Sequence, residues 1–356
     1  MDIKFDFDDI LIVPEVKSHI TSRYKDITLP PKLPLFTAPM DTVVDLKNKH
    51  IFSKNKINVV LPRTIPYESH LAHEIISGRN GEDSDFVSLG FDDLDKLYNG
   101  FFSKDFKKLH QNANILIDVA NGNMQKIVDY TVELKRLRPD ITIMVGNIAN
   151  PETYRWYAKQ KCVDFIRLGV GNGGGCLTTK QSGIGYPMAS LIYETKQIKN
   201  QMELEGFKNL PKIIADGGMK DYSDIIKALA LGADYVMLGS ILNKCLESCA
   251  DNYLYGFKLN KKWAEYFFSK KYPVKKYFRG MSTKEAQKAM GKTKFKTSEG
   301  VVRFRKVEYK LSGWVENFEH YLRNAMSYSN CKTLEEFIGS CQPIQITPSA
   351  YNRFNK

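Results

Sequence analysis

The chain has 356 residues, of which 43% are hydrophobic and 26% charged, so it is long enough to bury a large core. It contains no run near the ~18 uninterrupted apolar residues of a membrane helix, and it does not begin like a signal peptide, so a cytoplasmic protein is expected. The net charge of +12 favours anionic partners such as nucleotides, but the dispersed lysines are more typical of a solvated surface than of a nucleic-acid groove.

Eight short apolar runs predict strands: Pro34–Thr37, Ile57–Leu61, Phe86–Leu89, Asn114–Asp118, Ile141–Val145, Asp164–Leu168, Lys212–Asp216 and Tyr235–Leu238. Amphipathic stretches between them predict helices: Leu94–His110, Met124–Leu137, Thr153–Lys161, Met188–Glu205 and Asp221–Leu231. Alternating strands and helices imply a parallel sheet. Eight such units imply an α/β fold of the (β/α)8 TIM-barrel type, whose usual size is ~250 residues.

A C-terminal extension follows the eighth strand, from about Asn252, and includes a predicted helix at Val315–Met326. Residues 344–356 have the composition of a flexible tail. We see no linker, low-complexity tract or further repeat. The chain is therefore expected to be a single catalytic domain over residues 1–343, followed by that tail.

The six cysteines form no Cys-x-x-Cys pair, which favours a reducing compartment and argues against a zinc site. Cys245 and Cys249 are spaced one helical turn apart, and we expect both to be buried as small apolar residues.

Glycine and polar residues follow five consecutive predicted strands, at the point where each strand ends. These segments are Asp118–Gly122, Gly146–Asn147, Gly171–Cys176, Asp216–Gly218 and Gly239–Ser240. Glycine commonly ends a strand for structural reasons alone. Five such segments in one register, however, are typical of the catalytic face of a barrel, which lies at the C-terminal strand ends.

In the segment Gly171–Cys176, four glycines precede one cysteine. Glycine-rich backbone directly after a strand can fold tightly and approach a ligand closely. Cys176 is therefore a candidate nucleophile, whose thiolate requires neighbouring donors or cations. No histidine lies near it in sequence, so a protease-type Cys–His pair is not indicated. The alternative is an ordinary loop cysteine.

The segments after the seventh and eighth strands predict a nucleotide site. Backbone N–H groups at Gly217, Gly218 and Gly239 are suited to bind a phosphate, and Ser240 adds a hydroxyl donor. Asp216, an acceptor when ionised, suits the two hydroxyls of a ribose, although helix capping is its alternative role. Together these groups predict a binding site for a nucleoside monophosphate.

Several ordered motifs resemble the IMP dehydrogenase/GMP reductase family over nearly the whole chain. They are Phe7–Pro14, Ala38–Thr42, Asp118–Gly122, Val145–Asn147, Gly169–Cys176, Ile214–Gly218, Met237–Ser240, Arg279–Ser282 and Ser298–Gly300. The resemblance implies that Cys176 attacks C2 of a purine monophosphate and that a nicotinamide cofactor exchanges hydride with that carbon.

The resemblance also implies roles for further residues. As catalytic groups it implies Thr178 and Glu299, which move protons at C2, together with Asp118 and Arg63. As substrate-binding residues it implies Met40, Gly174, Gly175, Asp216, Gly217, Gly218, Gly239, Ser240, Arg279, Gly280, Met281 and Ser282. For the cofactor it implies Asp118, Asn121, Gly169 and Gly171, and for a monovalent cation such as K+ the backbone carbonyls of Gly171, Gly173 and Cys176.

Three features resemble the reductase branch more than the dehydrogenase branch. The regulatory CBS insert after the second strand is absent, since Leu61 soon leads to the third strand at Phe86. Thr283–Ser298 is too short for the dehydrogenase flap and holds no Arg-Tyr pair. Thr179–Pro187 resembles the reductase version. The implied reaction is reduction of GMP by NADPH to IMP and ammonia, in a homotetramer by analogy with the family.

The chain also departs from the family pattern. Gly174 replaces a serine that helps to hold phosphate, Phe278 aligns with a phosphate-binding tyrosine of the dehydrogenases, and Arg63 replaces a lysine. Arginine keeps the charge but is a poor proton donor. A deoxynucleotide or a modified guanine nucleotide therefore remains an alternative substrate. The alternative functions are a minimal NAD-dependent IMP dehydrogenase and a non-catalytic barrel that binds purine nucleotides or nucleic acid.

Overall fold

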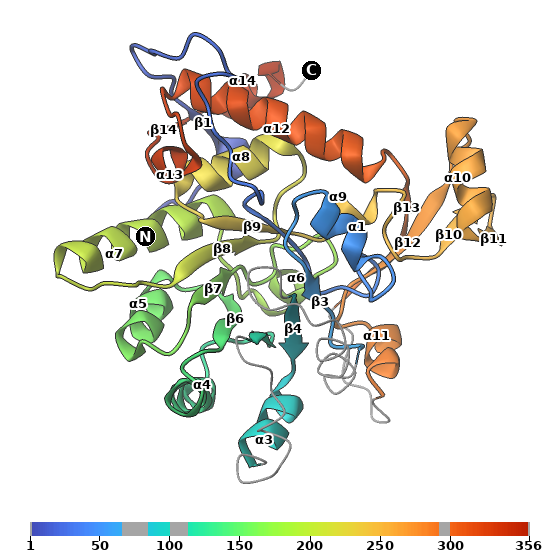
Figure 1. Ribbon diagram of the computed structural model, residues 1–356, viewed down its shortest axis with the longest axis horizontal. Coiled ribbons are helices and arrows are strands. Elements are labelled where there is room, and N and C mark those ends of the chain that lie inside the picture. The colour runs from blue at the N-terminus through green and yellow to red at the C-terminus, as the bar shows by residue number, and fades with distance from the viewer. Residues whose placement is uncertain (1, 66–84, 100–112, 292–299, 355–356) are drawn as a thin grey trace.

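The computed structural model describes residues 2–65, 85–99, 113–291 and 300–354. Its main feature is one parallel eight-stranded sheet, ordered β2-β9-β8-β7-β6-β5-β4-β3 (Figure 1). The strands are β2 (Leu35–Thr37), β3 (Val60–Leu61), β4 (Phe86–Leu89), β5 (Asn114–Asp118), β6 (Thr142–Ile148), β7 (Phe165–Leu168), β8 (Lys212–Asp216) and β9 (Tyr235–Leu238). A parallel bridge between Phe36 and Asn58 links the segments at the two edges, so the sheet closes on itself. The predicted (β/α)8 barrel is confirmed.

Helices surround the barrel, as the amphipathic patterns predict. They are α1 (Lys49–Lys54), α3 (Phe91–Asn99), α4 (Gln125–Leu137), α5 (Pro151–Gln160), α7 (Met188–Leu204), α8 (Tyr222–Leu231) and α12 (Leu311–Tyr328). Local capping explains two of the helix starts. The Asn150 side chain accepts a hydrogen bond from the backbone N–H of Glu152 at the start of α5. The Asp221 side chain accepts one from the backbone N–H of Asp224 at the start of α8. The second half of the predicted helix Leu94–His110 lies outside the described residues.

The barrel interior is filled at the beginning of its strands by aromatic rings. Phe36, Phe86 and Phe165 meet edge to face, with ring centroids 5.7–6.2 Å apart, and Tyr235 packs against Phe36 at 5.1 Å. Such buried rings bring a large apolar area out of water and exclude polar ligands from that end. The open end of the barrel is therefore the one at the C-terminal strand ends.

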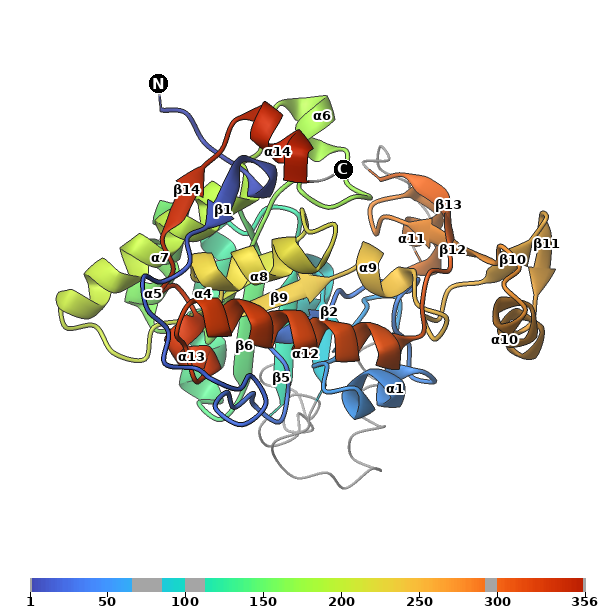
Figure 2. The same ribbon diagram turned by 90° about the horizontal axis from the view of Figure 1, so that it is seen from above.

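The C-terminal extension begins with a small antiparallel sheet, ordered β11-β10-β12-β13, which projects to one side of the barrel (Figure 2). Its elements are β10 (Asn252–Leu254), β11 (Phe257–Leu259), α10 (Lys261–Ser269), β12 (Lys275–Arg279), α11 (Lys284–Ala289) and β13 (Val302–Lys306). The end of β12 and the start of β13 return to the open end of the barrel. There, residues 280 and 300 approach the segment Gly171–Cys176, which we call the cysteine loop.

The chain termini pair with each other, which differs from the weakly ordered tail expected after residue 344. After the 3-10 helix Phe7–Asp9, β1 (Ile10–Ile12) runs antiparallel to β14 (Pro343–Gln345), and α13 (Leu334–Phe337) and α14 (Pro348–Phe354) flank β14. Because β14 finds its hydrogen-bonding partner more than 300 residues away, no local sequence pattern indicates this order.

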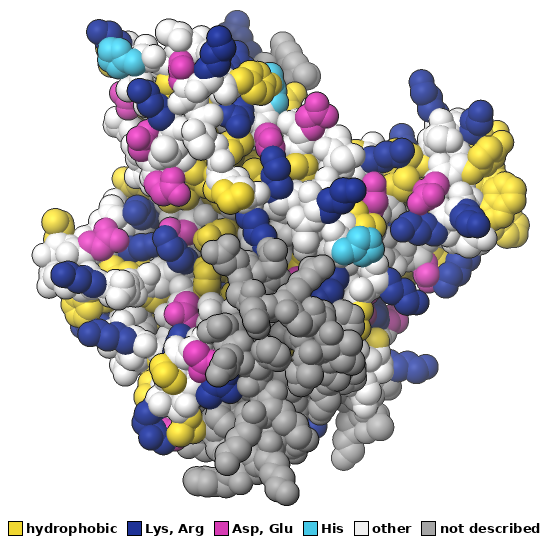
Figure 3. Space-filling model, in the orientation of Figure 1, with side chains coloured by type: hydrophobic (Ala, Val, Ile, Leu, Met, Phe, Trp, Pro, Cys, Tyr) yellow, Lys and Arg dark blue, Asp and Glu magenta, His cyan; other side chains and the backbone are white. Residues whose placement is uncertain are grey.

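All six cysteines are free. Cys245 is buried as predicted, and burial raises the pKa of its thiol to about 12. Cys249 is only half-buried, and its thiol donates a hydrogen bond to the carbonyl oxygen of Asp41 over 3.2 Å. Over the described ranges, no helix has the length and apolar character that crossing a membrane requires. Lysine and arginine side chains are mixed with acidic ones on the face shown in Figure 3.

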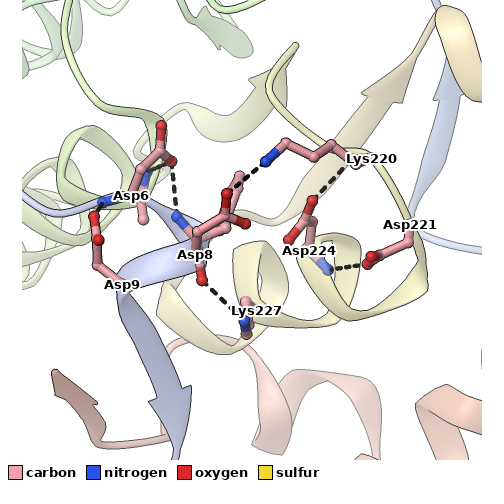
Figure 4. A network of polar contacts seen from close by, with 9 residues as sticks. Asp6, Asp8, Asp9, Lys220, Asp221, Asp224 and Lys227 are labelled. Atoms are coloured by element: carbon pink, nitrogen blue, oxygen red, sulfur yellow. Dashed lines mark hydrogen bonds and ion pairs between the residues drawn. The ribbon is translucent and has the colours of Figure 1, made fainter. Parts of the chain in front are cut away.

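The start of α8 holds a buried acid. The Asp224 carboxylate accepts the backbone N–H of Lys220 over 2.8 Å, while its own N–H donates to Asp221 (Figure 4). Burial, only partly opposed by the hydrogen bond from Lys220, raises the pKa of Asp224 to about 6. In the unfolded chain this carboxyl ionises near pH 4. The free energy of unfolding therefore falls as pH rises from about 4 through 6, because the folded protein must ionise this buried carboxyl.

Asp224→Asn is expected to raise the free energy of unfolding at pH 8 by about 1–3 kcal/mol, because a neutral amide keeps the acceptor without the buried charge. At pH 4 the gain should vanish, since the wild-type carboxyl is then protonated in the fold. Urea unfolding of both proteins at the two pH values measures the difference. Asp221→Asn, at the exposed helix cap, is the control. An equal effect of Asp224→Asn at both pH values would contradict the assignment.

Candidate active site

A cavity of about 580 Å³ opens at the C-terminal ends of the barrel strands. Residues at or just after the C-terminal ends of seven of the eight strands line it, from Ala38 after β2 to Ser240 after β9. The glycine-rich and polar segments that follow five predicted strands all contribute to its wall. The strand ends therefore meet around one space, as the register of the sequence motifs predicts.

Cys176 lies half-buried in this wall, between β7 and the short helix α6 (Thr178–Ser182). Its Sγ donates a hydrogen bond to Oγ1 of Thr178 over 3.2 Å, and its backbone N–H donates to the carbonyl oxygen of Gly173 over 2.9 Å. The thiol thus lies in the cavity wall beside a hydroxyl that accepts its hydrogen bond. A thiol in this setting is accessible to a ligand, unlike the buried Cys245.

Two positions of the loops around Cys176 require glycine. Gly171 has φ +82°, and a Cβ there would lie 1.7 Å from Oγ1 of Thr179. Gly217 has φ +90°, and a Cβ there would lie 2.8 Å from the backbone nitrogen of Gly173. Both the backbone conformation and the close approach exclude a side chain. The loop after β8 is consequently packed directly against the cysteine loop.

The C-terminal extension contributes a third segment. Cys176 and Gly300 form an antiparallel bridge, and the N–H of Val301 donates to the carbonyl oxygen of Gly175 over 3.1 Å. The N–H of Gly280 in turn donates to the carbonyl oxygen of Val301 over 3.1 Å. Glu299, expected to move protons at C2, precedes Gly300 in the sequence but lies outside the described residues.

The floor of the cavity contains a buried group of charges. Arg167 on β7 is only 3% exposed, and its guanidinium forms an ion pair with Asp118 and lies 3.6 Å from Asp216. Arg63 contacts the other carboxylate oxygen of Asp118 over 2.8 Å, and the side-chain amide of Asn147 donates to Asp216 over 2.9 Å. The structure thus brings together Asp118, Arg63 and Asp216, as the sequence motifs predict.

The two aspartates of this group are shifted in opposite directions. Burial alone raises the pKa of Asp118, but Arg63 and Arg167 outweigh it and hold the pKa below its usual value. For Asp216 burial dominates and raises the pKa, although Arg167 and Asn147 oppose it. The arrangement keeps Asp118 as an ionised acceptor and makes Asp216 the more easily protonated of the pair.

Sequence reasoning did not single out Arg167 as a functional residue. The signal that could have found it is its position inside the apolar run Phe165–Leu168, where an arginine is unexpected unless it is paired. Asn147 was noted only as part of a strand end. Its contact with Asp216 arises because β6 and β8 lie near each other in the barrel, which no local sequence pattern indicates.

Most of the other residues implied by the resemblance also line the cavity: Met40, Gly169, Gly171, Gly173, Gly174, Gly175, Gly217, Gly218, Gly239, Ser240, Gly280, Met281 and Ser282. Two residues do not line it. Arg279 is almost fully buried and pairs with Asp41, and Asn121 is exposed, with its side chain accepting the N–H of Asn123. Their predicted ligand contacts remain predictions.

Comparison with known proteins agrees with this geometry. A family model described as the IMP dehydrogenase/GMP reductase domain matches residues 106–354, which is more than half of the chain. The chain belongs to this family. The match begins before β5 and includes the cysteine loop, the ends of β8 and β9 and the C-terminal extension, so the family assignment rests on the same segments that surround the cavity.

Relatives from both branches of the IMP dehydrogenase/GMP reductase family align with the chain. GMP reductase 2 of Bos taurus is 30% identical over 338 residues, covering 89% of this chain and 85% of its own. GMP reductase of Buchnera aphidicola is 27% identical and covers 99% of this chain and 97% of its own. Inosine-5'-monophosphate dehydrogenase of Chlorobaculum parvum is 30% identical but covers 65% of this chain and 45% of its own.

Proposed function

We propose that the protein is a GMP reductase-like oxidoreductase, which converts GMP, or a related guanine nucleotide, to IMP and ammonia with NADPH as the reductant. The observation that carries the proposal is the Cys176 thiol in the cavity wall, 3.2 Å from the hydroxyl of Thr178 and beside the glycines at the ends of β8 and β9. Coverage of almost the full length of both this chain and a GMP reductase supports the reductase branch.

The reaction begins with attack of the Cys176 sulfur on purine C2. A bond forms between sulfur and C2, the bond between C2 and the exocyclic nitrogen breaks, and the nitrogen leaves as ammonia after taking up a proton. Loss of ammonia requires an acid near C2. Thr178 is placed to relay a proton between the thiol and the leaving group, and Glu299 is its partner by family resemblance.

The thioimidate at C2 is then reduced and the thiolate leaves, which yields IMP. When bound, the nicotinamide cofactor supplies the hydride for this step. The cavity offers a hydrogen-bond acceptor for the nicotinamide cofactor, because Asp118 lines the wall and the two arginines that pair with Asp118 keep its carboxylate ionised. A monovalent cation fits the cysteine loop in one respect, since the Gly173 carbonyl that accepts the Cys176 N–H keeps a second lone pair. NADPH, a monovalent cation and a homotetramer all remain predictions.

The proposal predicts that GMP and NADPH are consumed together, with one ammonia released per NADPH oxidised. The fall in NADPH absorbance and an ammonia assay measure the consumption of the reductant and the release of the product, and the sample without GMP is the control. Formation of NADH from IMP and NAD, with no reaction of GMP, would assign the protein to the dehydrogenase branch. Tight binding of purine nucleotides without turnover of any of them would support a non-catalytic role.

A further inference from the structure

Arg305 on β13 lines the cavity although its strand looks solvent-exposed in sequence. Its guanidinium carbon lies 4.3 Å from the centroid of the Phe278 ring on the neighbouring β12, so the flat cation stacks on the aromatic face. This stacking fixes the plane of the guanidinium and leaves its N–H groups directed along the ring surface.

Among the described residues, Arg305 differs from the other cations in the cavity wall because it has no acidic partner. Within the described part of the chain it takes part in no ion pair, and its Nε, like those of Arg63 and Arg167, is buried without a hydrogen-bond partner. The other wall cations all pair with acids: Arg63 and Arg167 with Asp118, Lys220 with Asp8, and Lys244 with Glu308. A partly buried, unpaired cation is costly, and a bound anion would offset that cost.

The local charges increase this cost. Burial, and next the charge of Arg303 two residues earlier, lower the pKa of Arg305. Arginine stays protonated all the same, so Arg305 places a permanent positive charge in the cavity wall. A ligand with negative charge at this position would gain more than one that approaches an already paired cation such as Arg63.

The guanidinium lies directly over the cysteine loop. A Cβ added at Gly174 would come within 3.2 Å of Nη2 of Arg305, and one added at Gly175 would come within 3.1 Å of the Phe278 ring. Arg305 therefore occupies the space that a side chain at position 174 would need. Arg305 thus lies beside Gly174 and on the ring of Phe278, the two positions at which the resemblance implies a phosphate-binding side chain that this chain lacks.

We propose that Arg305 binds the 5'-phosphate of the nucleotide substrate, with its guanidinium N–H groups donating to the phosphate oxygens. Arg305 thus supplies hydrogen-bond donors to the phosphate from β13, whereas Gly174 and Phe278 have no side-chain donor. The proposal rests on the proposed function only in that the ligand is a nucleoside monophosphate. It adds a phosphate-specificity residue that sequence motifs do not reveal.

The test compares Arg305→Leu with Arg303→Leu in the full-length protein. Arg303 is exposed on the same strand, so its replacement removes the same charge outside the cavity. Calorimetry gives the dissociation constants of GMP, guanosine and ribose 5-phosphate for each variant. We expect Arg305→Leu to weaken the binding of GMP and of ribose 5-phosphate by about 10- to 100-fold and to leave the binding of guanosine unchanged. Arg303→Leu should change the dissociation constants of GMP and ribose 5-phosphate far less than Arg305→Leu does, and should also leave that of guanosine unchanged.

A second variant guards against a simple folding defect. Gly174→Ala adds a methyl group next to Nη2 of Arg305 without adding a hydroxyl, so it should weaken GMP binding in the wild type but much less in Arg305→Leu. Equal loss of GMP and guanosine, or no loss of either in Arg305→Leu, would overturn the proposal. Selective loss of the phosphate-bearing ligands in a protein that shows no turnover would retain the role of Arg305 while rejecting GMP reduction.

Discussion

Cys176→Ala is expected to abolish turnover of GMP while leaving its dissociation constant close to that of the wild type. Among the described residues, Cys176 is the only cysteine that lines the cavity, so the variant removes its one thiol. Loss of a covalent nucleophile lowers kcat by a factor on the order of 10⁴ or more. Binding depends instead on the strand-end glycines and the charged floor, which the variant leaves intact. Steady-state kinetics and calorimetry measure the two quantities.

Cys341→Ala is the matched control, because Cys341 is also free and half-buried but does not line the cavity. It should keep wild-type activity. Cysteine alkylation offers an independent readout: GMP should slow modification at Cys176 and leave Cys341 unprotected. Activity retained by Cys176→Ala would exclude the thioimidate route, and loss of both binding and activity would point to damage of the loop.

The barrel itself was predictable because its strands are determined locally. Each parallel strand is buried on both faces and so appears as a short apolar run, and each is followed by an amphipathic helix. β8 and β9 match their predicted bounds. β6 extends beyond its prediction, from Val145 to Ile148, because backbone pairing with β7 continues past the apolar run and through an irregularity at Gly146–Ile148.

The parts that escaped prediction depend on contacts between distant segments. Val302–Lys306 looks like a solvated strand, since charged residues alternate along it, yet Arg305 enters the cavity because β12 brings Phe278 beneath it. The pairing of β1 with β14 likewise has no local signal. The cysteine loop was predictable for the opposite reason: Gly171 is required by its left-handed backbone conformation and by the close approach of Thr179, so its signal is local and visible in the sequence.

Arg167→Met is expected to cause the largest loss of stability. Its guanidinium lies between Asp118, which is buried, and Asp216, which is partly buried, in the cavity floor. Removing one partner of a buried ion pair costs about 3–5 kcal/mol when the remaining charge has no compensation. Without Arg167, Asp216 keeps only the hydrogen bond from Asn147, while Asp118 keeps its ion pair with Arg63, so a loss near the lower end of this range is expected. Arg136→Met is the control, since Arg136 pairs with Glu133 on the surface and such pairs contribute less than about 1 kcal/mol.

The pH dependence distinguishes an electrostatic loss from lost packing. In the wild type Arg167 lowers the pKa of Asp118 and opposes the rise in that of Asp216, so without it both carboxyls ionise at higher pH. As pH falls from 8 to 5, the variant can neutralise these carboxyls by taking up protons, and its deficit relative to the wild type should shrink. Urea unfolding across this range measures the deficit. A deficit that is the same at every pH would mean that Arg167 acts by packing alone. Asp216→Asn in the Arg167→Met background should recover part of the loss at pH 8, because Asp216 then has no cationic partner among the described residues, whereas Asp118 keeps its ion pair with Arg63.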